Sequence, residues 1–188
     1  MTADRRRTGT RAALIGAALT LLRRQGISGT GVEQVCRAAG VSKGVFAHHF
    51  PGGKRALVAA CLDRNSEDFA AMMDRTLDLS DGTTPGIVRT LFAGYAELMR
   101  RYGTDVGCPM AAAAVDTGTG AAGAGSPAAA AVEQWRGRAV AVHADLAGHD
   151  ELMLAAMEGA LVLARATGDP DVLERVGDSL AELLSRTD

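Results

Sequence analysis

The chain has 188 residues and only 5 prolines, which favours a helical protein long enough for one small unit and a larger helical domain. It lacks the apolar run of roughly 20 residues that a membrane span needs, a signal-peptide cleavage site and a paired set of cysteines, so we expect a soluble cytoplasmic protein that does not enter a membrane. Residues 1–55 hold ten Lys or Arg against two acidic residues, a charge of +8, and residues 56–188 hold ten against twenty, a charge of −10. This split indicates a nucleic-acid-binding head on an acidic body, with an ordinary surface distribution as the alternative.

Hydrophobic spacing predicts the first helix. Leu14, Ala18 and Leu22 recur every four residues, which favours a helix over about 10–25 that stops at Gly26.

Two shorter helices follow it. Thr30 is expected to cap a second helix, in which Cys36 lies on the buried face. Gly40 can adopt the positive φ of a tight turn, and Ser42 then caps a third helix over about 43–49.

Periodicity predicts six more helices, over about 54–76, 85–102, a short one from Pro109, 128–147, 150–167 and 170–186. The small residues of segment 117–127 predict a loop. The last two helices carry apolar stripes broader than one small domain must bury. This favours a partner subunit, although a monomer core could also bury both stripes.

Residues 30–58, TGVEQVCRAAGVSKGVFAHHFPGGKRALV, have the pattern of a helix-turn-helix whose second helix can enter the major groove. The segment resembles the TetR family of bacterial repressors, through residues that include Gly40, Val41, Ser42, Gly44, Phe46, Phe50 and Lys54. The C-terminal part resembles the LmrA/YxaF-like branch, through PGGK at 51–54, GCPMAA at 107–112, Trp135 and MEGALVLAR at 157–165.

The resemblance implies an all-α fold with two domains. Residues 1–53 would form a three-helix DNA-binding domain, and residues 54–188 a helical ligand-binding and dimerisation domain. It further implies a homodimeric repressor of transcription rather than an enzyme. The repressor would bind a palindromic double-stranded operator without a cofactor, and a small, mostly apolar inducer would release it. Genes for efflux or detoxification are the expected targets.

Matching positions in the family imply a set of DNA-contacting residues: Arg5, Arg6, Arg7, Arg11, Thr30, Ser42, Lys43, Gly44, Val45, Ala47, His48, His49 and Lys54. The first four would form a basic arm that reaches a minor groove. Two positions depart from the family, which usually has Ser or Thr in place of Val45 and Tyr in place of Ala47. Val45 would exchange a hydrogen bond for apolar contact, for example with a thymine methyl group.

The resemblance also implies an inducer site, for which Met and aromatic side chains suit a pliable apolar cavity. The candidates are Phe69, Met73, Phe92, Tyr95, Met99, Cys108, Met110, Trp135, Met153, Met157 and Glu158, although core packing would account for the same residue types. No metal site is expected, because His48 and His49 are adjacent and point about 100° apart on a helix.

Two alternatives stay open. A helical enzyme could be built around Cys108 and the histidines, although no catalytic spacing supports it. The departures at Val45 and Ala47 instead suggest a protein-interaction module that keeps the head without binding DNA.

Overall fold

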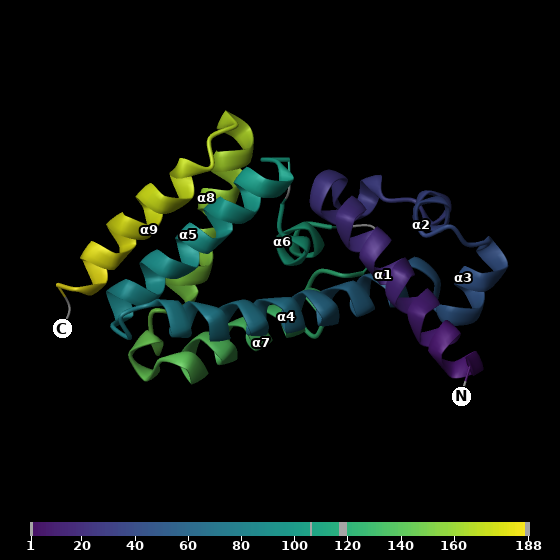
Figure 1. Cartoon of the computed structure of the whole chain (residues 1–188), viewed down its shortest axis with the longest axis horizontal. Coiled ribbons are helices and arrows are strands. Elements are labelled where there is room, and N and C mark those ends of the chain that lie inside the picture. Colours follow the sequence, from purple (N-terminus) through teal and green to yellow (C-terminus); the bar gives the residue numbers. More distant parts are fainter. Residues whose placement is uncertain (1, 106, 117–119, 187–188) are drawn as a thin grey trace. The chain divides into compact units, whose positions relative to one another are not determined.

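The computed structural model describes residues 2–105, 107–116 and 120–186, with side chains from Thr8 onward. All regular secondary structure in these residues is helical (Figure 1), which confirms the all-α prediction. None of the described helices is both long and apolar enough to cross a membrane.

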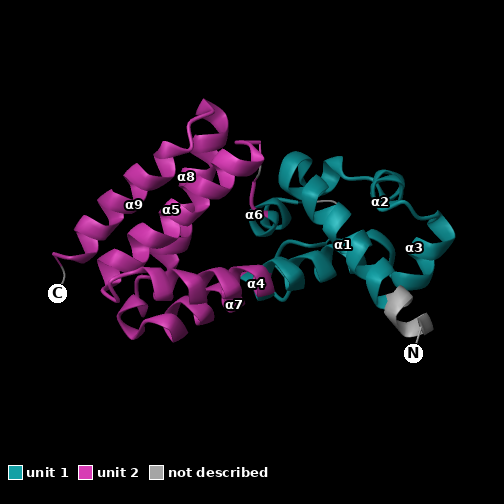
Figure 2. Cartoon of the chain, viewed as in Figure 1, with its two compact units in different colours: residues 1–65, 109–131 teal, residues 66–108, 132–188 magenta. Residues whose placement is uncertain are grey.

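The helices are α1 (Thr2–Gly29), α2 (Val32–Ala38), α3 (Lys43–His49), α4 (Gly53–Leu79), α5 (Thr84–Tyr102), α6 (Pro109–Ala114), α7 (Pro127–Val142), the 3-10 turn η1 (Ala144–Leu146), α8 (Asp150–Thr167) and α9 (Asp171–Leu184). They fall into two compact units (Figure 2). Unit 1 comprises residues 1–65 and 109–131, and unit 2 comprises residues 66–108 and 132–188. Helices α4 and α7 therefore each begin in unit 1 and end in unit 2. The functional boundary between residues 53 and 54 stays a prediction.

In unit 1, α1 buries the stripe that its spacing predicts, with Leu14 and Ala18 at 0% exposure and Leu22 at 2%. The predicted stop at Gly26 is a break in helical geometry, with φ 71° and ψ −179°, after which one more turn follows. At its other end the helix extends back to Thr2, beyond the predicted start.

The prediction that Thr30 caps α2 is wrong. The capping residue is Gly31, which makes no side-chain cap. The Thr30 hydroxyl instead donates to the carbonyl oxygen of Gly26 at 2.7 Å. The break at Gly26 interrupts the helical ladder and leaves carbonyl oxygens that need a partner, and Thr30 supplies one.

The turn between α2 and α3 has the predicted chemistry. Gly40 adopts φ 67°, and the Ser42 side chain accepts a hydrogen bond from the Val45 backbone N–H at 3.3 Å. The rings of Phe46 and Phe50 stack with centroids 5.6 Å apart, and both side chains are buried. These contacts fix α3 on the core of unit 1.

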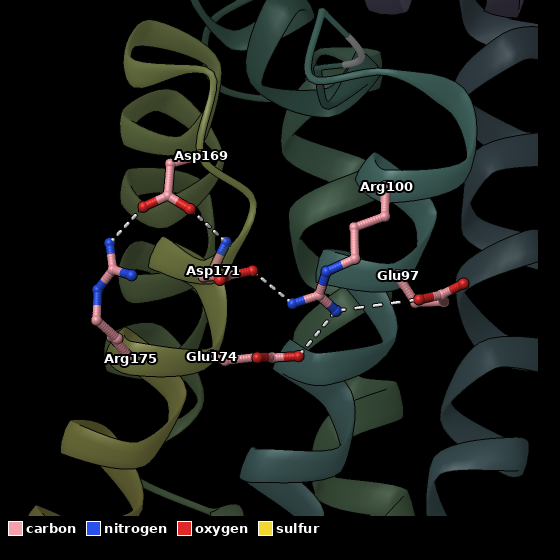
Figure 3. Close-up of polar contacts among 6 residues, drawn as sticks. All are labelled: Glu97, Arg100, Asp169, Asp171, Glu174 and Arg175. Carbon is pink, nitrogen blue, oxygen red and sulfur yellow. Dashed lines mark hydrogen bonds and ion pairs between the residues drawn. The ribbon is translucent and has the colours of Figure 1, made fainter.

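In unit 2, α9 packs against α5 and α8. Gly177 makes a close approach possible, because a Cβ at this position would lie 2.6 Å from the Cβ of Phe92. At one end of the α5–α9 pair, Arg100 donates to Asp171 at 2.6 Å and to Glu174 at 2.9 Å (Figure 3). The core of unit 2 therefore lies between these helices.

Two predicted segments differ in detail. The helix predicted over 128–147 ends at Val142, because His143 is extended, with φ −149° and ψ 118°, and the 3-10 turn then buries Leu146. Of the loop predicted over 117–127, residues 120–126 are non-helical, and residues 117–119 lie outside the described residues.

Candidate functional site

Helix α3 exposes most of the candidate DNA-binding residues. Ser42, Lys43, Gly44, Val45, Ala47 and His48 are exposed, and His49 is half-buried. Because Phe46 and Phe50 hold the opposite side of α3 in the core of unit 1, this exposed side has the shape of a helix face that can enter a DNA groove.

The ammonium group of Lys43 is paired within the helix-turn-helix. Its Nζ donates to Oε1 of Glu33, a residue in the first turn of α2. The hydrogen bond from Lys43 and the charge of Lys43 lower the pKa of Glu33, and Arg37 adds to this effect. Sequence reasoning counted Glu33 as a charge and missed it as a partner of Lys43.

Two further basic candidates lie on α1 and α4. The Arg11 guanidinium stands over the Phe50 ring, 5.2 Å from its centroid, which ties α1 to the end of α3. Lys54 is half-buried in the first turn of α4. Both residues belong to unit 1, as does α3.

The other candidate DNA-binding residues are Thr30, Arg5, Arg6 and Arg7. Thr30 is only 3% exposed, and its hydroxyl donates to Gly26. The side chains of Arg5, Arg6 and Arg7 lie outside the described residues. The basic arm therefore stays a prediction.

The candidate ligand-binding residues gather in unit 2, with Met110 as the exception in unit 1. The rings of Phe69 on α4 and Trp135 on α7 stack with centroids 5.0 Å apart. Most candidates are buried, namely Phe69, Met73, Phe92, Met99, Met110, Trp135, Met153 and Met157, while Tyr95, Cys108 and Glu158 are partly buried.

Glu158 is the acidic residue of this set. Burial raises its pKa, and a hydrogen bond with the Cys108 thiol works against that rise. In Cys61, by contrast, burial raises the thiol pKa to about 12, and the thiol donates to the Ile15 carbonyl oxygen. Among the described side chains, no three His, Cys, Asp or Glu stand close enough to hold a metal ion.

A second surface was only partly anticipated from sequence. Along α8, the exposed residues Leu152, Ala155, Gly159, Val162 and Ala166 recur at spacings of three and four, so they lie on one side of the helix. Leu152 is 50% exposed and Val162 is 64% exposed. The apolar stripe predicted for this helix comprises Leu152, Met153, Met157, Leu161 and Ala164, of which all but Leu152 are buried.

Comparison with known proteins connects these features. Residues 14–61 match the bacterial regulatory proteins of the tetR family, and residues 86–179 match the C-terminal domain of LmrA/YxaF-like transcriptional regulators. An uncharacterized HTH-type transcriptional regulator of Mycobacterium tuberculosis is 30% identical over 192 residues, covering 94% of each chain. The chain belongs to the TetR family. Its members are transcriptional regulators rather than enzymes, and α2 and α3 form the DNA-binding helix-turn-helix of this one.

Other relatives agree with this assignment. The transcriptional regulator LmrA of Bacillus subtilis is 33% identical over 73 residues, which cover 37% of this TetR-family regulator and 39% of LmrA. A TetR regulatory protein of Rhodobacter sphaeroides superposes with a TM-score of 0.74 at 24% identity, covering 91% and 96% of the two chains. A TetR-family regulator of Agrobacterium tumefaciens does so with a TM-score of 0.77 at 17% identity, covering 94% and 98%. These two structures share the fold.

Proposed function

We propose that this TetR-family regulator is a homodimeric repressor, which binds a palindromic operator through α3 and leaves it when a small, mostly apolar ligand binds in unit 2. The DNA-binding part of the proposal rests on the exposed side of α3. It presents Lys43, Val45 and His48 to solvent while Phe46 is held in the core. One charged and one apolar side chain can together read base edges and thymine methyl groups.

The test is selection of random DNA duplexes by the purified protein at two salt concentrations. We expect a two-fold symmetric sequence, because a dimer would present two copies of α3 to half-sites about 34–36 Å apart. Lys54→Ala should lower the salt slope by about one, since one phosphate contact is lost. Arg75→Ala, which removes an exposed cation from the part of α4 in unit 2, is the matched control and should leave the slope unchanged.

A folded protein that enriches no duplex would overturn operator binding. It would favour the protein-interaction module, since the exposed apolar side chain of Val45 and the small side chain of Ala47 would then serve a protein partner.

The dimer part of the proposal rests on the exposed apolar side of α8. Leu152 and Val162 lie on it, Leu163 beside them is 52% exposed, and Leu183 on α9 is 57% exposed. A second copy is the occupant we propose, because small residues such as Gly159 between the larger ones let two identical helices approach closely. Leu163→Arg should convert a dimer to a monomer in light scattering, whereas Leu79→Arg, at a 78% exposed position of α4, should not. A monomeric unsubstituted protein would refute this part.

The ligand part rests on the stacked pair of Phe69 and Trp135 among buried methionines. Trp135 is the single tryptophan of the chain, so its fluorescence reports directly on this region. A panel of mostly apolar drug-like compounds should contain binders that change Trp135 emission, raise the melting temperature and release the selected operator. Compounds that change emission without releasing DNA would count against induction from this site.

Release requires that the ligand bind the DNA-free arrangement more tightly than the DNA-bound one. Phe69 and Met73 lie on α4, the same helix whose first turn holds Lys54, so a ligand against them could shift α4. Scattering curves that are identical with and without such a ligand would contradict this step. Genes for efflux or detoxification are the proposed targets, and altered expression of neighbouring transport genes on deletion is the observation that tests them.

A further inference from the structure

The ammonium group of Lys43 is held by Glu33 in the DNA-free protein. Both side chains are 66% exposed, and they belong to the two helices of the helix-turn-helix. In residues 1–55 the only other acidic residue is Asp4. A carboxylate therefore stands beside the single Lys of α3, within a segment that is otherwise strongly basic.

The pairing of Lys43 with Glu33 affects its contacts with DNA phosphates and its contacts with base edges differently. Binding to any DNA sequence depends on cations that neutralise phosphates and release counterions. An ammonium that stays with a carboxylate adds little to that term, and the carboxylate itself repels a nearby phosphate. A guanine edge presents the uncharged acceptors O6 and N7. Lys43 has three N–H donors, so it can donate to such an edge while it keeps Glu33.

We propose that Glu33 is a specificity-determining residue of the DNA-binding surface, which weakens the contact of Lys43 with phosphate in any sequence and leaves its remaining donors to a base edge. This inference rests on the proposed operator binding. Glu33 thereby lowers the affinity for unrelated DNA more than the affinity for the operator.

The experiment compares the full-length protein with Glu33→Gln on two duplexes of equal length, the selected operator and a scrambled sequence. Fluorescence anisotropy is measured across a range of salt concentrations. For the scrambled duplex we expect affinity to rise about five- to tenfold near 0.1 M salt and the salt slope to steepen by about 0.9, as one more cation reaches a phosphate. Operator affinity should rise less, so the ratio of the two affinities falls.

Two controls separate the pair from general charge. Asp63→Asn makes the same acid-to-amide change at an exposed position of unit 1 that lies on α4, outside the helix-turn-helix. In a Lys43→Ala background, Glu33→Gln should steepen the salt slope for scrambled DNA no more than Asp63→Asn does, because no ammonium group remains at position 43 to reach a phosphate. Thermal melting of each variant checks that the fold is intact.

The outcomes are distinct. Equal effects of Glu33→Gln and Asp63→Asn, or weaker operator binding by Glu33→Gln, would overturn the role of Glu33 while operator binding by the unsubstituted protein stands. If the unsubstituted protein binds no duplex selectively, operator binding fails and the role of Glu33 fails with it.

Discussion

A single methyl group at Gly177 should destabilise unit 2, because α9 packs closely on α5 at this residue. A Cβ at this position would lie 2.6 Å from the Cβ of Phe92 and 2.9 Å from its Cγ. These atoms form the fixed base of a side chain with 0% exposure, so a change of rotamer cannot relieve the clash. Gly177→Ala must therefore push the two helices apart.

The size of the effect follows from two opposing terms. Overpacking a well-packed core costs about 1–3 kcal/mol. Replacing glycine by alanine inside a helix returns about 1 kcal/mol. The 2.6 Å contact places the overpacking cost in the upper part of its range, at about 2–3 kcal/mol, so we expect Gly177→Ala to lower the free energy of unfolding by about 1–2 kcal/mol on balance. Gly137 in α7 is the matched control, since it is exposed and a Cβ there meets no atom within 4 Å. Gly137→Ala should gain about 0.5–1 kcal/mol.

The assay is urea unfolding followed by far-UV circular dichroism, with all variants at one protein concentration so that any dimerisation contributes equally. The two variants should differ by about 1.5–3 kcal/mol, with the unsubstituted protein between them. If Gly177→Ala were as stable as Gly137→Ala, the close approach of α5 and α9 would be wrong.

Two further perturbations concern charged groups. Arg100→Ala removes the hydrogen bonds to Asp171 and Glu174, so the melting temperature should fall slightly at low salt, and a difference that persists in high salt would contradict an exposed electrostatic contact. For Glu158, burial raises the pKa above the ordinary value of 4.5, so the stability linked to its neutral form is present at low pH and lost as pH rises through the raised pKa. Glu158→Gln should therefore gain stability relative to the unsubstituted protein as pH rises above 4.5, and a pH-independent difference in urea unfolding would refute this.

Helix positions were predictable from sequence, and some helix ends were not. The sequence predicts Thr30 as the cap of α2, but the neighbouring Gly31 has about the same propensity for a cap position. The break at Gly26 decides between them, because it supplies an acceptor for the Thr30 hydroxyl. The end of α7 at Val142 was likewise not predictable, because no proline or glycine stands directly after it. His143 leaves the helix and comes within 3.4 Å of the Thr84 hydroxyl, a contact 59 residues away in sequence.

The exposed side of α8 shows a different limit. This helix is apolar on nearly all sides, so periodicity alone does not say which stripe faces the core. Met153 and Met157 are buried against other helices of unit 2, and Leu152 and Val162 are left in solvent. Only the packing of α5, α8 and α9 distinguishes them.

The candidate DNA-binding residues were predictable as a motif, because Gly40 and Ser42 are required by the turn itself. The pairing of Glu33 with Lys43 was not predictable, since the two residues are ten positions apart and meet only when α2 and α3 fold together. The ligand-site prediction grouped Met110 with residues that the fold places in the other unit. Residue type indicates an apolar environment, but it does not identify which unit supplies it.

In residues 1–55, we expect different residues to provide the salt-dependent affinity for DNA and the recognition of its base sequence. Of the ten basic residues in 1–55, only Lys43 lies on α3, and it is paired with Glu33. Most of the salt-dependent affinity must then come from cations outside α3, such as Lys54. Val45 is exposed on α3 and carries no charge. Val45→Thr should therefore change which base is preferred in duplex selection and leave the salt slope unchanged, whereas Lys54→Ala should change the slope and leave the preference. A salt slope that shifts with Val45→Thr would mean that α3 is seated differently on the duplex, and the separation of roles would fail.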